Sequence, residues 1–482
     1  MKTFNKTFII IFLVVALLKA SMVGSAQTDN HLENLIGNWE GKLTISGMTL
    51  RVVFKISMDA SGRIITTMDS PDQGIKGIPV EDVQLKDKEL HLGIKSVGGY
   101  FEGIISNDLL TISGQLHQAG QSFPIALKRV KQEIRIKRPQ EPQKPYPYLE
   151  EEVTYMNKDA GITLAGTLTL PAKEGLFPAV ILISGSGTQD RDETVLDHKP
   201  FLVLSDYLTR LGIAVLRVDD RGIGGSTGGS RKDTSEDFAG DVISGIEYLK
   251  NRKEINPKLI GLIGHSEGGI IAPMVAAENH EIAFVIMLGG TGLSGEEVIY
   301  LQAAMLAKAS GASDELVNIQ RNNQEKLFNI LKEETNNSIA EEKMRNVMTE
   351  MLGEMSEDEK NILYLTENNI ESQLQIMLSP WYRNFLFYDP RIALKRVICP
   401  VLAIVGEKDL QVAPKENLQA IEEALKSGNN KDYKVIEMPN LNHLLQTAET
   451  GSPTEYGKIE ETISPGVLEL VGQWILEKTG KK

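Results

Sequence analysis

The stretch LIGLIGHSEGGIIAPMVAAE, residues 259–278, joins a short apolar run to a segment with the composition of a helix. An apolar run of this length is typical of a strand buried on both faces. Ser266 therefore falls at a predicted strand-to-helix turn, with Gly264 and Gly268 where side chains would collide. A G-x-S-x-G match arises often by chance in a chain with 43 glycines. The surroundings must therefore decide whether Ser266 is a nucleophile.

Similar apolar runs recur on both sides of this stretch. They are FPAVILI (177–183), IAVLRVD (213–219), LIGLIG (259–264), FVIMLGG (284–290) and CPVLAIVG (399–406). Amphipathic helical segments, such as 201–211 and 238–252, lie between most of them. Short apolar strands that alternate with helices predict an α/β fold, a mostly parallel sheet covered by helices on both faces. Active sites of such sheets lie at the carboxyl ends of the strands.

One long interval breaks this alternation. Residues 292–390 are helical in pattern and rich in Met and Gln, and they contain no strand of the apolar type. We interpret them as a helical cap inserted over the carboxyl edge of the sheet. The Met residues are expected to pack inside the cap, although flexible Met side chains can also line an adaptable acyl pocket.

A serine hydroxyl becomes a useful nucleophile only when a base takes its proton. In this topology an acid and then a histidine follow the serine in the chain. Of seven histidines, only His280 and His443 follow Ser266. His280 ends the helix that the serine begins, far from the turn. His443 is therefore the predicted base, and His265 is not, because an adjacent residue cannot easily fold its ring onto Ser266.

The acid must precede His443 and follow the carboxyl end of a strand. Asp409 comes directly after the run VLAIVGEK, whereas Asp432 precedes the strand YKVIEM and so lies at the opposite edge. Ser266, Asp409 and His443 then each follow a different strand at the same edge. This agreement predicts a Ser-Asp-His catalytic triad.

The backbone donors for an oxyanion are expected at two places. The N–H of Glu267 lies at a helix N-terminus, where it faces developing negative charge. The second donor is expected in the segment SGSGTQDRDE (184–193), called here the oxyanion loop, from Ser186 or Gly187. The charged stretches QDRDE and VDDRGIGGS (218–226) are expected to brace these loops and not to act on substrate.

Residues 28–130 predict a separate all-β domain. Segments 50–56, 63–69, 83–95 and 108–116 are rich in β-branched residues and are separated by turn signals. Trp39 is expected in the core of this domain rather than in a ligand platform. Residues 131–150, which include four prolines, are interpreted as an extended linker.

Residues 1–26 have the basic start, apolar run and small-residue end of a secretory signal peptide, with an uncleaved anchor as the alternative. We therefore expect export to the periplasm or the medium, without stable membrane insertion after processing. The net charge of −14 argues against nucleic acid as a partner. The single cysteine, Cys399, is expected to be a buried inert thiol.

The motifs SGSGTQDRDE, RVDDRGIGGS, GHSEGG, GEKDLQVAP and NLNH, within residues 151–482, resemble the α/β-hydrolase superfamily. Within it they are similar to bacterial serine carboxylesterases of the EstD type, which often carry an N-terminal β domain. The resemblance implies hydrolysis of short to medium acyl esters, without a cofactor or metal, and assigns Ser266, Asp409 and His443 as nucleophile, acid and base. Where many relatives have His-Gly at the start of the oxyanion loop, this chain has Ser184-Gly185.

The expected function is thus an exported serine esterase that acts on a small-molecule ester through an acyl-enzyme. A serine aminopeptidase or prolyl-type peptidase of the same fold is one alternative, and acidic residues in 296–372 could then bind the substrate amine. A polymer-binding protein with a vestigial hydrolase domain is another. In either case the β domain could contact glycan or polymer.

Overall fold

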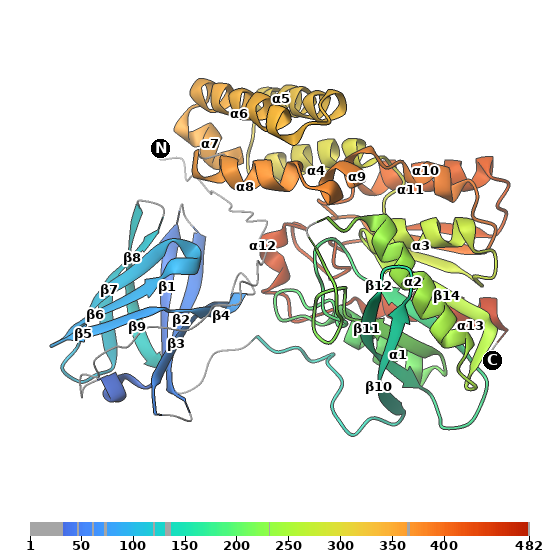
Figure 1. Cartoon of the computed structure of the whole chain (residues 1–482), viewed down its shortest axis with the longest axis horizontal. Helices are drawn as coiled ribbons and strands as arrows, with labels where there is room; N and C mark the ends of the chain where they lie inside the picture. Colours follow the sequence, from blue (N-terminus) through green and yellow to red (C-terminus); the bar gives the residue numbers. More distant parts are fainter. Residues whose placement is uncertain are drawn as a thin grey trace. The chain divides into compact units, whose positions relative to one another are not determined.

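The computed structural model describes residues 32–480, apart from 46–47, 60–61, 72–74, 119–120, 131–135, 231 and 364–366. The predicted signal peptide, residues 1–26, lies outside the described residues. The chain divides into two compact units, Met1–Lys137 and Arg138–Lys482, which are described separately (Figure 1).

The first unit is all-β, as predicted. Its strands are β1 Gly37–Ile45, β2 Met48–Met58, β3 Ile64–Ser70, β4 Ile75–Pro79, β5 Asp82–Lys86, β6 Glu89–Ile94, β7 Gly99–Ile105, β8 Thr111–Gln118 and β9 Gln121–Val130. They form one antiparallel sheet in the order β4-β3-β2-β1-β9-β8-β7-β6-β5. The peptide N–H of Val80 bonds to Thr66 in β3, and that of Glu81 bonds to Gly93 in β6. Val80 and Glu81 therefore connect β4 at one edge of the sheet with β5 at the other, and the sheet is strongly curved.

The concave side of this sheet is filled by apolar side chains. Trp39 in β1 is fully buried, and its Nε1 donates to the carbonyl of Leu35 at 2.8 Å. The expectation that Trp39 is a core residue is confirmed. Segment 83–95 holds two strands and not one, because Asp87, with a φ of 54°, forms the turn between β5 and β6. Aspartate tolerates this left-handed conformation better than most residues do.

The second unit contains an eight-stranded, mostly parallel sheet. Its strands are β10 Leu149–Asn157, β11 Ile162–Leu170, β12 Phe177–Ile183, β13 Ala214–Val218, β14 Ile255–His265, β15 Val285–Leu288, β16 Val401–Gly406 and β17 Tyr433–Met438. Their order is β10-β11-β13-β12-β14-β15-β16-β17, and only the β10-β11 and β11-β13 pairs are antiparallel. All five apolar runs named from the sequence lie on strands of this sheet.

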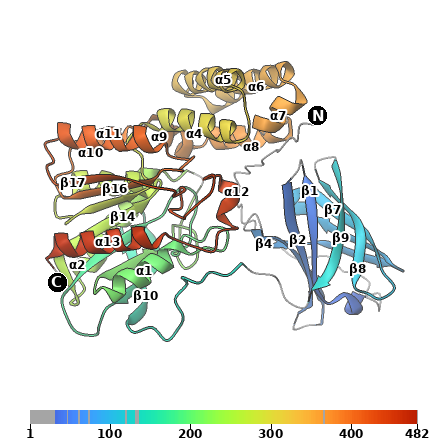
Figure 2. The same ribbon diagram turned by 180° about the vertical axis from the view of Figure 1, so that it is seen from behind.

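Helices cover both faces of this sheet. They are α1 Pro200–Arg210, α2 Ser235–Lys250, α3 Gly268–Glu278, α10 Pro390–Leu394, α11 Pro414–Ser427 and α13 Pro465–Thr479, while the short α12 Pro453–Tyr456 lies in a loop. Side chains alternate along β12, so that Ile181 belongs to the apolar cluster that includes residues of α2, α3, α10 and α11, and Val180 belongs to the cluster that includes residues of α1 and α13. Figure 2 shows β14, β16 and β17 between α10 and α11 on one side and α13 on the other.

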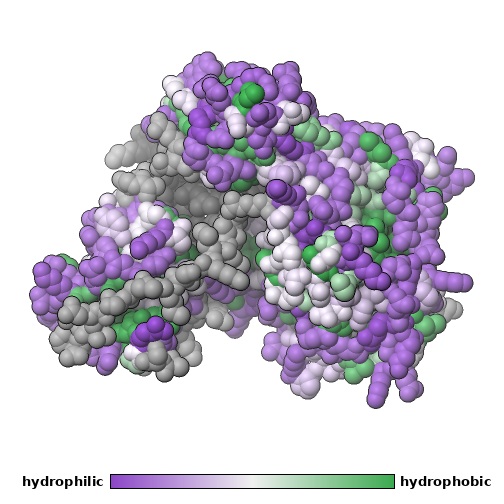
Figure 3. All heavy atoms as spheres, viewed as in Figure 1, coloured by the Kyte–Doolittle hydropathy of each residue, from purple (hydrophilic) through white to green (hydrophobic). Residues whose placement is uncertain are grey.

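The predicted cap is helical. It comprises α4 Gly295–Ala309, α5 Asp314–Glu333, α6 Asn337–Glu354, α7 Glu357–Leu363, α8 Glu367–Met377 and α9 Pro380–Phe387, inserted between β15 and β16. Met344 and Met348 are buried among Leu and Phe side chains of α5, α6 and α8, which confirms a packing role for these methionines. Within the described chain, no helix combines the length and apolarity needed to cross a membrane. The visible face of the second unit is mostly hydrophilic, with apolar residues in small separate areas (Figure 3).

The boundary between the two units falls after Lys137, inside the predicted linker, and the part of the linker from Arg138 onward belongs to the second unit. The Arg138 guanidinium donates to backbone carbonyls of two loops of this unit, including that of Ile459 at 2.7 Å. The side chain of Gln140 bonds to the backbone of Thr462 and Ile463. These hydrogen bonds hold the proline-rich segment on the second unit.

Candidate active site

Ser266 lies between β14 and α3 with a φ of 53°, a left-handed conformation that is uncommon for a residue with a side chain. Its own N–H donates to the carbonyl of Leu288 at 2.8 Å. A Cβ at Gly264 would lie 1.9 Å from the Gly268 carbonyl oxygen, and a Cβ at Gly268 would lie 2.1 Å from that of Ile183. Both glycines are therefore sterically required for this turn, as the sequence predicts.

His443 and Asp409 lie together at the same edge of the sheet, in the loops that follow β17 and β16. His443 Nδ1 is 2.7 Å from Asp409 Oδ2, and both residues are buried. Asp409 Oδ1 accepts from the N–H groups of Gln411 and Val412, each at 2.8 Å. An ionised carboxylate at Nδ1 selects the tautomer whose Nε2 is free to accept a proton.

His265, the residue before the serine, occupies a separate position beside His443. Its Nδ1 is 2.8 Å from Glu193 Oε1, and its Nε2 is 3.1 Å from the carbonyl oxygen of His443. Both acceptors lack a proton to give, so both ring nitrogens must donate, which makes His265 an imidazolium. Burial opposes this charge, but the charge and hydrogen bond of Glu193 outweigh it and raise the pKa of His265 to about 9.

The His265 ring packs beside the ring of the predicted base, and the centroids of the His265 and His443 rings are 5.0 Å apart. His265 already donates from both nitrogens and so cannot accept the serine proton. The exclusion of His265 as the base stays a prediction from the sequence. The sequence contained no signal for the bridge that His265 makes between Glu193 and the His443 loop.

The oxyanion loop follows β12 and is held largely by two carboxylates. Asp220 accepts from Ser184 Oγ at 2.9 Å and from the N–H of Gln189 at 2.8 Å. Burial raises the pKa of Asp220 to about 7, although these two hydrogen bonds favour its charged form. Glu193 Oε1 accepts from the N–H of Gly185 at 2.7 Å. The start of the loop, where this chain has Ser184-Gly185, is therefore anchored at both residues.

The predicted oxyanion donors lie close to the serine. A Cβ at Gly185 would be 3.2 Å from Ser266 Cβ, so the loop runs directly past Ser266. Among the described residues, the N–H groups of Glu267, Ser186 and Gly187 donate to no protein acceptor, whereas that of Gly185 is taken by Glu193. Gly187 has a φ of 92°, which a residue with a side chain would rarely adopt.

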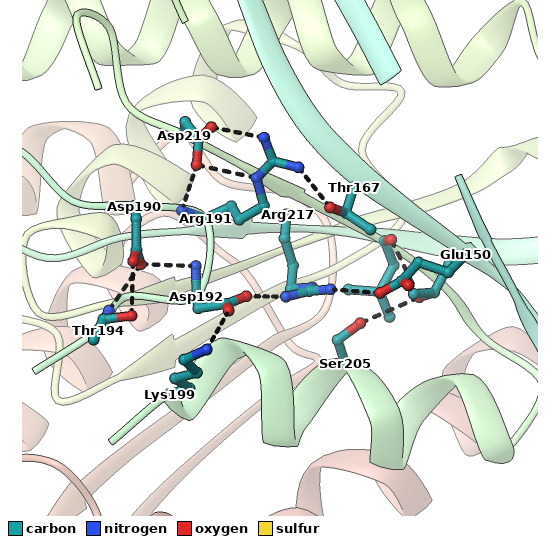
Figure 4. A network of polar contacts seen from close by, with 12 residues as sticks. Glu150, Thr167, Asp190, Arg191, Asp192, Thr194, Lys199, Ser205, Arg217 and Asp219 are labelled. Atoms are coloured by element: carbon teal, nitrogen blue, oxygen red, sulfur yellow. Dashed lines mark hydrogen bonds and ion pairs between the residues drawn. The ribbon is translucent and has the colours of Figure 1, made fainter. Parts of the chain in front are cut away.

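The charged stretches pair with each other, as predicted (Figure 4). Arg191 Nη2 is 2.7 Å from Asp219 Oδ2, and its Nε donates to Oδ1 at 3.0 Å. Arg217 on β13 bonds to Asp192 in the oxyanion loop. Planar guanidinium–carboxylate pairs of this kind define orientation as well as distance. They brace the loop against the sheet and leave its opening residues to face Ser266.

The side chain of Glu267 is a contact that the sequence did not reveal. Its carboxylate accepts from Ser235 Oγ at 2.6 Å and from Trp381 Nε1 in the cap at 2.9 Å. Burial raises the pKa of Glu267, and the hydrogen bonds from Ser235 and Trp381 oppose that shift. A carboxylate at the start of an otherwise apolar helix was the signal that could have pointed to it.

The chain is similar in sequence to known hydrolases. The family model described as serine aminopeptidase, S33, matches residues 200–345. Esterase EstD of Thermotoga maritima is 26% identical over 334 residues, which cover 68% of this chain and 69% of EstD. The putative hydrolase YtaP of Bacillus subtilis is 30% identical over 131 residues, 24% of this chain and 44% of YtaP.

Two solved structures are similar to the second unit. The α/β hydrolase GrgF from a Penicillium species aligns with a TM-score of 0.43 and 18% identity, over 69% of this chain and 99% of GrgF. The Pyrococcus furiosus esterase Pf2001 aligns with a TM-score of 0.40 and 15% identity, over 69% of this chain and 91% of the esterase. The resemblance drawn from the motifs is confirmed: the chain has the α/β-hydrolase fold behind an N-terminal β domain, and its sequence is similar to EstD-type esterases.

Proposed function

We propose that the protein is a serine esterase in which Ser266, His443 and Asp409 form a catalytic triad that cleaves short to medium acyl esters. The observation that carries this proposal is the buried His443–Asp409 hydrogen bond of 2.7 Å, at the sheet edge where Ser266 leaves β14. The similarity to the esterase EstD supports an ester as the substrate.

The reaction proceeds in two acyl transfers. His443 Nε2 takes the proton of Ser266 as the serine oxygen attacks the ester carbonyl, and the alcohol leaves with that proton. The N–H groups of Glu267 and of Ser186 or Gly187 donate to the oxyanion. A water that gives its proton to His443 then attacks the acyl-enzyme, and the carboxylic acid leaves as Ser266 regains its proton.

Ser266→Ala tests this proposal and should lower p-nitrophenyl butyrate turnover by at least about 10³-fold, because no other group can form the acyl-enzyme. Covalent labelling by a fluorophosphonate should disappear with it. The matched control is Ser244→Ala in α2, whose hydroxyl bonds only to the backbone of its own helix, and this variant should keep both signals. Turnover that survives in Ser266→Ala at the wild-type rate would rule out the proposed mechanism.

A peptidase of the same fold is the second candidate, favoured by the S33 serine aminopeptidase model. Such an enzyme needs a carboxylate open to the substrate amine. Glu267 is engaged by Ser235 and Trp381, and Glu296 and Glu297 in the cap are paired with Lys332 and Arg391. These pairings favour an ester. Comparing aminoacyl-naphthylamides with p-nitrophenyl esters on the same enzyme separates the two.

Export of the protein to the periplasm or medium is part of the proposal, supported by the pattern of residues 1–26. The N-terminal sequence of the protein recovered from its native host should then begin after Ala26. A protein that keeps Met1 would contradict export by cleavage.

We propose in addition that the β domain contacts glycan or another polymer. On its outer face Tyr100 stacks between His91 and His117, with centroid distances of 5.4 and 4.5 Å. Exposed aromatic rings provide flat apolar surfaces that retain polar edges. Tyr100→Ala should reduce co-sedimentation with insoluble polysaccharide and leave soluble-ester turnover unchanged.

A further inference from the structure

The ring of His265 connects the oxyanion loop to the backbone of the proposed base. Glu193, the last residue of the oxyanion loop, accepts from the N–H of Gly185 at 2.7 Å, and the same Oε1 atom lies 2.8 Å from His265 Nδ1. On the other side of the ring, His265 Nε2 lies 3.1 Å from the carbonyl oxygen of His443. Two side chains thus span the distance from the backbone of Gly185 to that of His443.

This connection is buried and passes beside the proposed nucleophile. Glu193, His265 and His443 are all buried, so water cannot readily replace a hydrogen bond that is lost. His265 directly precedes Ser266, and a Cβ at Gly185 would lie 3.2 Å from Ser266 Cβ and 3.6 Å from His265 Nδ1. The oxyanion loop, the turn of Ser266 and the loop of His443 therefore meet at one ring.

The connection requires a proton on both nitrogens of the His265 ring. A carboxylate and a peptide carbonyl only accept hydrogen bonds, so each contact uses one ring N–H, and a neutral ring must release one partner. Burial lowers the pKa of His265, but Glu193, the carbonyl of His443 and the charge of Asp409 raise it to a net value of about 9. The His443 ring, with its centroid 5.0 Å away, is a further titratable group beside it.

We propose that His265 is a positioning residue whose two ring N–H groups hold the oxyanion loop and the His443 loop in a fixed arrangement relative to Ser266. This inference rests on the proposed esterase function. The transition state needs oxyanion donors and a proton acceptor aligned with the serine oxygen at the same time, and small displacements of either are costly. Loss of the connection should therefore slow the chemical step and leave substrate binding nearly unchanged.

The first test follows wild-type turnover of p-nitrophenyl butyrate, corrected for uncatalysed hydrolysis, and fluorophosphonate labelling of Ser266 as the pH is raised. Both rates should fall as the pH rises through about 9, because the deprotonated ring releases Glu193 or His443. In His265→Gln the amide oxygen replaces one ring N–H. This variant should lower kcat by roughly 10- to 100-fold at neutral pH with little change in KM, and it should lack the alkaline fall.

The second test is a double-mutant cycle between His265→Gln and Glu193→Gln in the full-length protein. If the two side chains act as one connection, the double variant should lose no more than about threefold beyond the larger single loss. Glu193→Gln alone, which leaves His265 in place, should move the alkaline fall away from pH 9 to lower pH, because the charge that favours the protonated ring is gone. Thermal denaturation checks that each variant is folded at the assay temperature.

The matched control is His280→Gln, which replaces an exposed histidine just after α3 and should keep the wild-type rate and its alkaline fall. Parallel pH profiles of the wild type and His265→Gln, an alkaline fall that stays near pH 9 in Glu193→Gln, or single losses that multiply would overturn the positioning role while the esterase function stands. A His265→Gln effect confined to KM would do the same. Absence of both ester turnover and Ser266 labelling in the wild type would overturn the proposed function and this inference with it.

Discussion

The loop that carries Asp409 and the oxyanion loop lie at the same edge of the sheet but are held by different interactions. Asp409 is oriented by the peptide N–H groups of Gln411 and Val412, its near neighbours in the chain. The oxyanion loop is anchored by the Glu193 carboxylate, which itself bonds to His265, 72 residues away. The first arrangement uses neutral local donors, and the second uses buried charges from distant segments.

This difference indicates how each half of the site responds to substitution. Peptide N–H donors remain in place whatever side chains the loop carries. The half of the site formed by Asp409 and His443, called here the acid–base half, should therefore be sensitive mainly to substitution of these two residues. Buried charged partners are costly to leave unpaired. The oxyanion half should therefore respond to residues such as Glu193 that never touch the substrate.

Asp409→Asn is the strongest test of the acid–base half. The asparagine must keep its oxygen toward the N–H groups of Gln411 and Val412, which turns its NH₂ toward His443 Nδ1. His443 then carries its proton on Nε2 and cannot accept one from Ser266. We expect kcat for p-nitrophenyl butyrate to fall by about 10⁴-fold with the fold retained.

The control for this variant is Asp432→Asn, at the opposite edge of the sheet, where the carboxylate pairs with Lys478. Its kcat should equal that of the wild type. A wild-type rate for Asp409→Asn would remove Asp409 from the triad.

Glu193→Gln tests the oxyanion half and should have a smaller effect. The amide oxygen can still accept from Gly185, but the charge that keeps His265 an imidazolium is lost. We expect kcat to fall by roughly 10- to 100-fold with little change in KM, because displacement of the loop weakens contacts made in the transition state. Steady-state kinetics on the same ester series provides the measurement.

Asp190→Asn neutralises a charge in the same loop without touching Gly185 or His265, because the Asp190 side chain accepts from Asp192 and Thr194 nearby and the substitution leaves its backbone unchanged. It should leave kcat within about twofold, as is typical of a surface substitution. Equal losses in the two variants would mean that the loop responds to charge in general and not to the Glu193 bridge.

The placement of the proposed triad residues at one edge of the sheet could be predicted from the sequence, because each follows a recognisable strand. Ser266, Asp409 and His443 come directly after apolar runs, so their common edge follows from the parallel order of the strands. The partners of the Glu193 and Glu267 side chains could not be predicted, although the carboxylate of Glu267 stands out at the start of an apolar helix. The partners are 72 residues away, at His265, and 114 residues away, at Trp381, and no local pattern identifies them.

The same limit applies to the fold. The run FPAVILI coincides with β12, since a strand buried on both faces is apolar throughout. Strand β10, Leu149–Asn157, was not identified, because it lies at the sheet edge and carries three consecutive glutamates. Its pairing with β11 defines it as a strand, and that pairing is not visible in the composition of the segment alone.

The smallest predicted effect comes from two buried histidines of the second unit, whose pKa values are shifted in opposite directions. Burial and the nearby Arg138 charge lower the pKa of His198 to about 4, whereas the pKa of His265 is raised to about 9. The stability from His265 is complete below its unfolded pKa of about 6.5 and is lost as the pH rises through about 9. The stability associated with a neutral His198 is present above about 6.5 and is lost as the pH falls through about 4.

Chemical denaturation across pH should therefore reveal a contribution of His265 to the free energy of unfolding that declines above about pH 6.5, and one of His198 that declines below it, by about 3 kcal/mol for each histidine. His265→Gln should flatten the alkaline limb and leave the acid limb intact, while His198→Gln should do the reverse. If His265→Gln left the alkaline limb unchanged, the imidazolium between Glu193 and the His443 carbonyl would be ruled out. The oxyanion half would then be held by neutral hydrogen bonds, like the half that carries Asp409.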